Sequence, residues 1–482
     1  MVAMDRGSLQ VDLTSQEGSR LHKPGSGDSE SIQILARGKT ARDAGGQLRV
    51  AFFVSYLPPH VGGIEVIAEG QIKALAECGQ AIRVITSACD SESGLSKDSG
   101  YEVRRIPAWN YFEEKMGAVF PLYLPSLLWH GYKAVKGSDI VHAHDAFYLT
   151  SLTAAFWARV LRKPLILTQH VDLVPHSSRV MTLAQKLVYA TTGSFILRST
   201  KKITVLNSRV RTFLIDKGID KSKIIFLPNG IDTEAFSPAT DDERSALRRK
   251  YNLPQDKVLA LFVGRFVPKK GFATLLSLET MSNLEFVFAG GHAPVNHHTR
   301  SDQHFLGPIT RAEAPDVFKM CDIFVLPSLG EGFPVTVQEA MASGLPIITT
   351  NDPAYDLYGL DDSLVKLIEP SIKMLSIALR SIVKDPKLRL EMGRYSREYA
   401  LSNFHIKTHI NRLIFLYKTQ LSRCADEFPD AAGKEFKADL ASHRSGPGGW
   451  WPRLGLSRLL ARATDPQPTP ASPGHSMGGP GT

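Results

Sequence analysis

Two glutamates and two cations in the second half of the chain have the types and the spacing to bind a charged ligand that carries hydroxyl groups. Glu331 and Glu339 are separated by seven residues, and Arg265 and Lys270 lie five positions apart in an earlier segment. A carboxylate accepts hydrogen bonds from hydroxyl groups but repels phosphate, whereas Arg offers a planar fork and Lys a point charge to a diphosphate. Taken alone, each pair is also what a solvated helix or loop of an ordinary α/β protein carries.

The two glutamates lie within residues 320–350, whose pattern predicts a strand, a turn, a helix and a second strand. The apolar run DIFVLPS precedes a turn over Leu329–Pro334, a helix follows over Val335–Ala342, and Gly344 stands where that helix ends. The N–H groups at the start of such a helix are unpaired, and the helix dipole favours an anion there. We therefore expect an anion-binding turn flanked by the two glutamates.

The cations follow a strand in the same way. The run VLALFV ends at Gly264, and Arg265 and Lys270 come before the next predicted helix. A similar order occurs near the start of the chain, where LRVAFFVSYLPP precedes Gly62, Gly63 and a helical stretch. Glycines at such a turn let the backbone approach a phosphate, although a Gly-Gly pair is more often only a tight turn.

Histidines stand at the ends of two further predicted strands. The strand SDIVHAHD ends with His142, His144 and Asp145, and the strand KPLILTQHVD ends with His170. In doubly wound sheets the carboxyl ends of the strands face the ligand crevice, so we expect His144 and His170 to point toward it. A lone histidine is usually structural, and two at neighbouring strand ends make a functional and a structural role equally good interpretations.

Length and composition fit a soluble globular protein of two or three domains, with 482 residues, 43% of them hydrophobic and 22% charged. Four cysteines lack CxxC spacing, which favours a reducing compartment and opposes a disulfide framework. The net charge of +9 suits phosphate-bearing ligands and anionic membranes, and no nucleic-acid-binding pattern occurs. The chain shows no signal peptide and no run of roughly 20 apolar residues, so we expect a cytoplasmic protein.

The segment EGFPVTVQEAMASGLPII resembles the Glu-x7-Glu motif of family 4 glycosyltransferases, the glycosyl transferases group 1. The PNGID pentad at 228–232 and the pattern of GR followed by KKG are similar to other parts of that family, so the resemblance spans about residues 48–420. It implies an α/β protein with the GT-B fold, in which two Rossmann-like, doubly wound domains face a cleft. It also implies a retaining hexosyltransferase that moves a sugar from a UDP-, GDP- or ADP-linked donor to an acceptor hydroxyl, with no metal or other cofactor.

The resemblance also assigns roles to individual residues. Glu339 would hold the ribose hydroxyls, the two cations would grip the diphosphate, and Glu331 would lie near the donor sugar. His170 would contact the donor sugar near the reacting carbon, and His144 would lie near the acceptor. The residues expected to bind the donor are Gly62, Gly63, Arg265, Lys270, Glu331, Gly332, Phe333, Pro334 and Glu339, and those expected to take part in catalysis are His170, Glu331, Arg265 and Lys270.

The chain divides into five expected parts. Residues 1–47 and 425–482 are rich in Gly, Ser, Pro or charge and predict a disordered leader and a low-complexity tail. Between them we expect an acceptor domain over 48–235 and a nucleotide-sugar domain over 236–402. The resemblance implies that a helix within 403–424 crosses back to the first domain. A metal site at His292, His297, His298 and His304 is disfavoured because their spacing is irregular.

Two segments leave more than one interpretation open. Residues 107–136 are rich in aromatic side chains, for which a buried helix pair is the default and a surface at a lipid interface the sharper alternative. The basic amphipathic segment Trp450–Arg462 fits anionic lipid or the protein's own surface equally. We therefore expect a sugar or a lipid-linked acceptor and contact with the inner face of the membrane. A catalytically silent scaffold and a nucleotide-sugar epimerase or hydrolase are the alternative functions.

Overall fold

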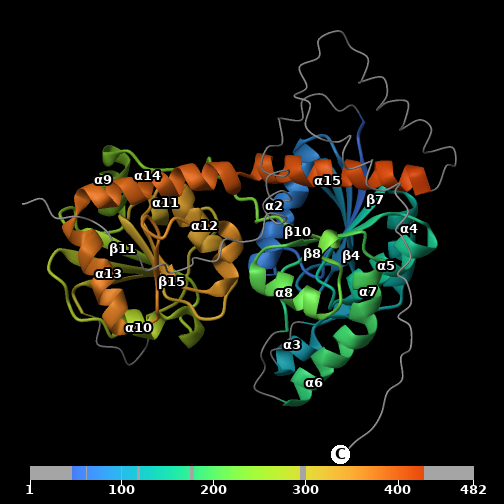
Figure 1. Ribbon diagram of the computed structural model, residues 1–482, viewed down its shortest axis with the longest axis horizontal. Coiled ribbons are helices and arrows are strands. Elements are labelled where there is room, and N and C mark those ends of the chain that lie inside the picture. The colour runs from blue at the N-terminus through green and yellow to red at the C-terminus, as the bar shows by residue number, and fades with distance from the viewer. Residues whose placement is uncertain are drawn as a thin grey trace, which may run out of the picture.

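The computed structural model describes residues 46–60, 62–98, 100–116, 120–173, 179–293 and 300–427. The predicted leader up to residue 45, the tail from residue 428, which includes Trp450–Arg462, and His297 and His298 lie outside the described residues. Figure 1 shows two α/β domains side by side, each built around a sheet with helices on both of its faces, and one long helical path along both of them.

The first domain is built on an eight-stranded sheet. Its strands are β1 (Arg49–Phe53), β2 (Ala81–Ser87), β3 (Gly94–Asp98), β4 (Tyr101–Ile106), β7 (Ile140–His144), β8 (Leu165–Gln169), β9 (Lys202–Val205) and β10 (Ile224–Phe226). They follow the order β10-β9-β8-β7-β1-β2-β4-β3, and every pair is parallel except the β3–β4 hairpin. Helices cover both faces of the sheet, so β1 is an apolar run after Arg49 and β7 is buried throughout, although β7 carries His142 and His144.

Helices cover this sheet from both sides. The elements between its strands are α2 (Gly63–Glu77), the short ribbon β5 (Ala108–Trp109) and β6 (Leu122–Tyr123), α3 (Tyr111–Met116), α4 (Ser126–Lys136), α5 (Leu149–Val160), α6 (Arg179–Val188), the π-helical turn η1 (Tyr189–Gly193), α7 (Ser194–Ser199), α8 (Ser208–Asp216) and the 3₁₀ turn η2 (Lys221–Lys223). One core cluster joins α4, α5, α7 and α8 to one face of the sheet. A second joins α2 and the last helix, α15 (Ile406–Glu427), to the opposite face.

The second domain contains a six-stranded parallel sheet. Its strands are β11 (Val258–Val263), β12 (Leu284–Ala289), β13 (Gln303–Gly307), β14 (Ile323–Leu326), β15 (Ile347–Thr350) and β16 (Lys366–Ile368), in the order β13-β12-β11-β14-β15-β16. The helices around it are α9 (Asp241–Lys250), η3 (Pro268–Lys270), α10 (Phe272–Leu276), α11 (Ala314–Lys319), α12 (Val335–Ala342), η4 (Pro353–Tyr358), α13 (Ile372–Lys384) and α14 (Pro386–Asn403). A single large apolar cluster fills this domain.

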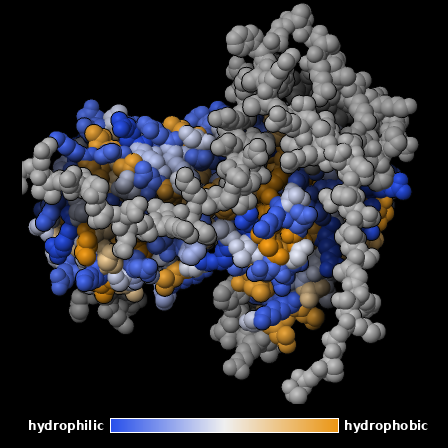
Figure 2. Space-filling view, in the orientation of Figure 1, coloured by the Kyte–Doolittle hydropathy of each residue, from blue (hydrophilic) through white to orange (hydrophobic). Residues whose placement is uncertain are grey.

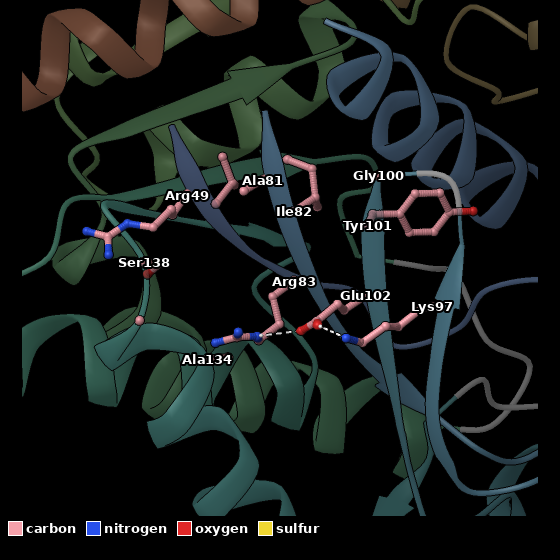
Figure 3. A pocket seen from close by; sticks show the side chains of 12 residues that line it. Arg49, Ala81, Ile82, Arg83, Lys97, Gly100, Tyr101, Glu102, Ala134 and Ser138 are labelled. Atoms are coloured by element: carbon pink, nitrogen blue, oxygen red, sulfur yellow. Dashed lines mark hydrogen bonds and ion pairs between the residues drawn. The ribbon is translucent and has the colours of Figure 1, made fainter. Parts of the chain in front are cut away.

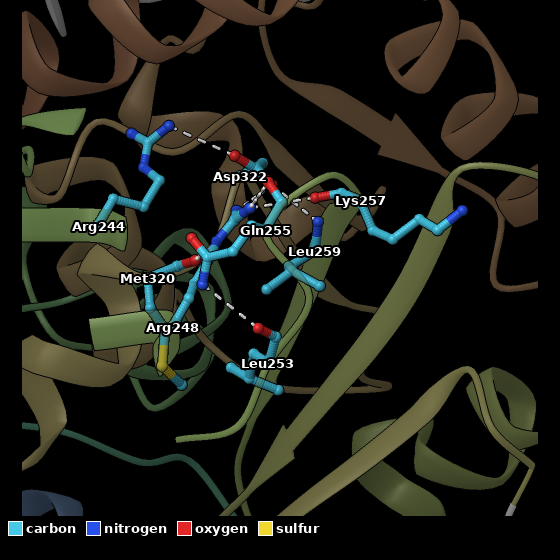
Figure 4. Close-up of polar contacts among 8 residues, drawn as sticks. All are labelled: Arg244, Arg248, Leu253, Gln255, Lys257, Leu259, Met320 and Asp322. Atoms are coloured by element: carbon cyan, nitrogen blue, oxygen red, sulfur yellow. Dashed lines mark hydrogen bonds and ion pairs between the residues drawn. The ribbon is translucent and has the colours of Figure 1, made fainter. Parts of the chain in front are cut away.

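A buried arginine fixes α9 to the second sheet. The helix starts with a capping box, in which Thr240 and Glu243 satisfy each other's backbone N–H groups. Further along, Arg248 donates to Asp322 at 2.7 Å, and Asp322 also accepts from the N–H of Leu259 at 2.8 Å (Figure 4). Leu259 and Asp322 lie where β11 and β14 begin, so this network stabilises the edge of the sheet opposite to the carboxyl ends of its strands.

The prediction of a buried helix pair over residues 107–136 is wrong. The segment forms the β5–β6 ribbon, α3 and α4, and several of its aromatic residues are exposed, among them Trp109 and Trp129. The reason lies in α4, whose apolar residues stand on two sides of the helix. Leu127 faces the core, while Leu128 and Trp129 stay at the surface.

The last helix returns to the first domain, as Figure 1 shows. α14 ends in the second domain at Asn403, and α15 then packs against α2. His409 on α15 hydrogen-bonds the carbonyl of Pro228 at 2.7 Å and the amide of Gln71 at 2.9 Å. Tyr417 hydrogen-bonds His142 in the middle of the first sheet at 2.6 Å. None of the helices in the described part of the chain has the length and apolarity to cross a membrane.

Candidate active site

Two loops meet where the strand order of the second sheet reverses. β11 and β14 are neighbours there, and the chain leaves their carboxyl ends through residues 264–271 and 327–334, which is the usual place for a ligand in a doubly wound sheet. The N–H of Leu329 donates to the carbonyl of Lys269 at 2.8 Å. Gly271 permits this approach, since its φ is +74° and a Cβ there would lie 2.2 Å from the carbonyl oxygen of Pro327.

This approach brings Lys270 and Glu331 together. The ammonium of Lys270 lies 2.6 Å from a carboxylate oxygen of Glu331, and the side chains are only 19% and 16% exposed. The pair therefore lies in a partly shielded site, where a charged ligand would compete for the ammonium. Arg265 lies on the same loop and is exposed, and its side chain makes no ion pair or hydrogen bond within the described residues. It is available to an anion.

The start of α12 presents free hydrogen-bond donors beside this pair. Pro334 precedes the helix and offers no side-chain cap. In the part of the chain that the structure describes, no acceptor meets the N–H groups of Gly332, Phe333 or the first two helical residues. The ring of Phe333 stacks on Tyr358 with the centroids 4.1 Å apart, which fixes the loop. A helix start with unpaired donors attracts negative charge, so this end of α12 adds to the positive field of Lys270 and Arg265.

Glu339 lies inside α12, is 3% exposed, and forms an ion pair with Arg311. Burial raises the pKa of Glu339, an effect that the charge of Arg311 opposes. Arg311 comes from the loop between β13 and α11 and also lies 4.9 Å over the ring of Phe236. Nothing in the local sequence around Arg311 pointed to this pairing, because only the folded sheet brings the loop of Arg311 to α12.

Residues of the first domain reach the same loop. A Cβ on Gly332 would lie 2.4 Å from the side-chain nitrogen of Asn207, which itself caps α8. Arg209 donates twice to Asp352 in the second domain, at 2.8 and 2.9 Å. The sequence analysis missed both contacts, since neither Asn207 nor Arg209 carries a local pattern that indicates a partner in the other domain.

The two expected histidines are in contact at neighbouring strand ends. His170 Nε2 lies 2.9 Å from His144 Nδ1, and both side chains are buried. Burial lowers the pKa of His170 to about 3 and that of His144 well below its ordinary value, so both imidazoles are neutral. The second ring nitrogen of His144 is buried and has no hydrogen-bond partner among the described residues. A ligand hydroxyl would reach this nitrogen only if the side chains packed around it moved.

Asp145, next to His144, holds the loop that carries His170. Its backbone has a φ of +57°, and one carboxyl oxygen accepts from the N–H of His170 at 2.8 Å and that of Val171 at 3.4 Å. The other oxygen is buried and has no partner in the described part of the chain. Burial raises the pKa of Asp145 to about 7. The sequence placed Asp145 at the strand end but gave it no role.

The loop with Gly62 and Gly63 already holds a carboxylate. A Cβ on Gly62 would lie 2.1 Å from the carboxyl oxygen of Glu65, and His60 lies 3.6 Å from the same group. Burial raises the pKa of Glu65. A donor diphosphate at this turn would therefore require Glu65 to move or to take up a proton.

A hollow of about 390 Å³ lies elsewhere, at the opposite edge of the first sheet. It opens among residues that start β1, β2 and β4, including Arg49, Arg83 and Tyr101 (Figure 3). Glu102 there pairs with Arg83 at 3.2 Å and with Lys97 at 3.3 Å. Parallel sheets bind ligands at the other edge, so this hollow is separate from the candidate site.

A metal site at the four histidines after β12 was disfavoured from their spacing, and only His292 and His304 of the four lie within the described residues. His304, from the histidine-rich segment, lies 2.6 Å from Glu285 on the neighbouring strand. No group of three or more His, Cys, Asp or Glu side chains is placed to hold a metal in the described ranges.

Comparison with known proteins matches both halves of the chain to family models. The model "Glycosyltransferase Family 4" matches residues 61–235, and the model "Glycosyl transferases group 1" matches residues 243–399. Among curated relatives, a D-inositol 3-phosphate glycosyltransferase of Corynebacterium glutamicum is 23% identical over 81% of this chain and 92% of its own. The UDP-Gal:alpha-D-GlcNAc-diphosphoundecaprenol alpha-1,3-galactosyltransferase of Escherichia coli is 27% identical over 59% of this chain and 77% of its own.

Solved structures share the arrangement of the two domains. A sucrose-phosphate synthase from Thermosynechococcus elongatus superposes with a TM-score of 0.60 at 19% identity, covering 78% of this chain and 99% of that one. HepE of Anabaena, in complex with UDP and glucose, gives a TM-score of 0.60 at 16% identity over 77% of this chain and 99% of that one. The α/β, GT-B fold expected from the sequence is thereby confirmed. The two family models, which match residues 61–235 and 243–399, show that the chain belongs to the family 4, group 1, glycosyltransferases.

Proposed function

We propose that this glycosyltransferase moves a hexose from a nucleoside-diphosphate sugar to an acceptor hydroxyl, with retention of the anomeric configuration. The observation that carries the proposal is the convergence of Lys270, Glu331 and the free N–H groups of α12 at the reversal of the second sheet. The donor nucleotide would lie mainly on the second domain and the acceptor on the first. Closure of the two domains around them would keep water from an activated sugar.

The leaving diphosphate would be stabilised by groups that the protein itself supplies. As the bond between the sugar carbon and the phosphate oxygen breaks, the electron pair stays on the diphosphate. Lys270 would exchange the carboxylate of Glu331 for a phosphate oxygen, and Arg265 and the start of α12 would add further positive charge. Electrostatic stabilisation of this kind is usually the largest catalytic contribution. Because these protein groups would supply it, the proposal assigns no metal or other cofactor to the reaction.

Retention is proposed from the resemblance to the retaining family 4 enzymes, and a same-face route is proposed because no carboxylate among the described residues of the site is placed as an obvious nucleophile. The acceptor hydroxyl would attack the face that the diphosphate leaves, and the departing phosphate would accept its proton. Glu331, once released by Lys270, would accept hydrogen bonds from the donor sugar. His170, neutral and held by Asp145 through its backbone N–H, would contact the same sugar, and His144 would lie near the acceptor.

Glu339 would bind the ribose hydroxyls in competition with Arg311. This contact is common to all nucleotides and leaves the base open. The name of the E. coli relative contains UDP-Gal, and a C. glutamicum relative is a GDP-mannose-dependent alpha-mannosyltransferase. A thermal-shift screen of UDP-, GDP- and ADP-sugars would identify the donor, because a ligand that binds only the folded state raises the melting temperature.

The proposal is tested by removing each cation in turn. We expect Arg265→Ala and Lys270→Ala to lower turnover about 100-fold or more, the size of effect seen when a charge-stabilising donor is lost. Lys269→Ala is the matched control, since this exposed lysine is on the same loop but its side chain points to no partner in the described residues. Circular dichroism would verify folding. Unchanged turnover in both variants would overturn the assignment, and an inverted product by NMR would overturn retention.

A further inference from the structure

The outer side of α4 and α5 carries an unpartnered apolar surface. We call it the α4–α5 face and define it by Leu128, Trp129, Tyr132, Lys133, Lys136, Phe156, Arg159 and Val160. Leu128, Trp129, Phe156 and Val160 are 51%, 57%, 44% and 54% exposed. The two helices touch, since the indole N–H of Trp157 donates to the carbonyl of Leu128 at 2.9 Å. These side chains therefore form one continuous patch.

The patch is accessible and faces away from the rest of the molecule. Figure 1 shows α4, α5 and α7 on the side of the first domain that is remote from the second domain. In Figure 2 apolar residues reach the surface at the edge of the first domain where α4 lies, beside strongly hydrophilic ones. A large apolar patch on a protein surface usually marks a binding surface.

Positive charge surrounds the patch. Lys133 lies 4.7 Å over the ring of Trp129, and Lys136 lies 5.5 Å over the ring of Tyr132. Neither helix contains an acidic residue. The charged residues of the face itself, Lys133, Lys136 and Arg159, are all cations.

We propose that the α4–α5 face docks onto an anionic lipid surface. Amphipathic aromatic rings settle at the level of lipid headgroups, and long lysine side chains extend from an apolar surface to reach phosphate. Each lysine near an anionic membrane contributes about fivefold in affinity. An acidic protein partner would complement the positive charge but not the exposed leucine, tryptophan, phenylalanine and valine as well. A lipid interface offers anionic headgroups and an apolar interior side by side.

The α4–α5 face lies apart from the candidate acceptor site. Phe156, Arg159 and Val160 stand in the last turns of α5, whereas His144 and Asp145 precede its first turn at the carboxyl edge of the first sheet. The docking itself does not rest on the proposed transfer reaction, because it needs no donor.

The experiment is flotation of the full chain with vesicles, without any nucleotide sugar. We expect binding to phosphatidylcholine vesicles that contain phosphatidylglycerol, weak binding to phosphatidylcholine alone, and loss of binding as salt is raised. Replacing both lysines, Lys133→Ala with Lys136→Ala, should weaken binding about thirtyfold at the fivefold contribution of each. Trp129→Glu with Phe156→Glu should abolish it.

Matched controls keep the test specific to this face. Phe415→Glu on α15 and Leu390→Glu on α14 change exposed apolar residues elsewhere and should bind like the unaltered protein. Circular dichroism would show that each variant is folded. The proposal is overturned if the face variants bind normally, or if Trp450→Ala with Trp451→Ala removes all binding. It is also overturned if no vesicle binds and the face variants instead turn a dimer into a monomer in sedimentation, because the face would then join two copies of the chain.

Discussion

Acidification should destabilise the first domain because four of its buried contacts depend on neutral imidazoles. Burial lowers the pKa of His142 and His170 to about 3 and that of His409 to about 4, from 6.5 in the unfolded chain, and His144 shifts in the same direction. A histidine whose folded pKa is depressed binds its proton only after unfolding. Its contribution is fully present above pH 6.5 and is lost as the pH falls toward the folded pKa.

The magnitude follows from these shifts. At pH 5.0 each of the three histidines with a stated pKa favours the unfolded state by about 2 kcal/mol, or about 6 kcal/mol together. Asp145 acts in the opposite sense, since its pKa rises from 3.8 to about 7 on folding. Its proton uptake below pH 7 favours the folded state by roughly 3 kcal/mol at pH 5.0. The net loss between pH 7.5 and 5.0 is therefore roughly 3 kcal/mol, and His144 adds to it.

Urea titrations at pH 7.5 and 5.0, followed by tryptophan fluorescence, would measure this loss. The probe is suitable because Trp109, Trp129 and Trp157 all lie in the first domain. His142→Gln removes one titrating group and should reduce the pH-dependent loss by about 2 kcal/mol, while His292→Gln, at an exposed position of the second domain, should leave it unchanged. A free energy of unfolding that is equal at both pH values, or higher at pH 5.0, would refute the reasoning.

Three further changes test the donor site. Gly271→Ala should destabilise the protein by roughly 2 kcal/mol or more, because Gly271 has a left-handed backbone and the carbonyl of Pro327 leaves no room for a Cβ. An unchanged melting temperature would contradict this prediction. Arg209→Ala breaks the ion pair with Asp352 between the domains, so small-angle scattering should show a wider range of domain separations than in the unaltered protein. Glu339→Ala should weaken nucleoside diphosphate binding roughly tenfold or more in calorimetry and remove the preference for ribose over 2′-deoxyribose, because no acceptor for the ribose hydroxyls remains there. A variant that keeps this preference would show that the carboxylate does not hold the ribose.

The sequence predicts those parts of the fold that depend on local patterns. Buried parallel strands are short apolar runs, and Gly344 marks the end of the helix over Val335–Ala342. The sequence therefore predicted the strand–turn–helix units that carry the candidate site. Such local patterns could not predict the ion pair between Lys270 and Glu331. It depends on β11 and β14 being neighbours, and strand order is set by packing across the whole domain.

Contacts between distant segments were missed for the same reason. Arg311 meets Glu339, and Asn207 meets the turn at Gly332, through elements that are far apart in the sequence. The prediction for the aromatic segment around Trp129 failed for another reason, since tryptophan and leucine occur in cores and on binding surfaces alike. Only the exposure of these side chains in the folded chain separates the two cases.

The path of α15 has a consequence for how the chain assembles during synthesis. The first domain leaves the ribosome first, yet one face of its sheet is covered by residues near 410–417, which are made only after the second domain. Until then Ile72 and Leu75 on α2 lack the apolar neighbours that complete their packing, and His142 lacks the hydroxyl of Tyr417. A nascent chain of this protein would thus carry an open hydrophobic groove through most of translation, and a premature stop before Ile406 would leave that groove permanently uncovered for chaperones or proteases to engage.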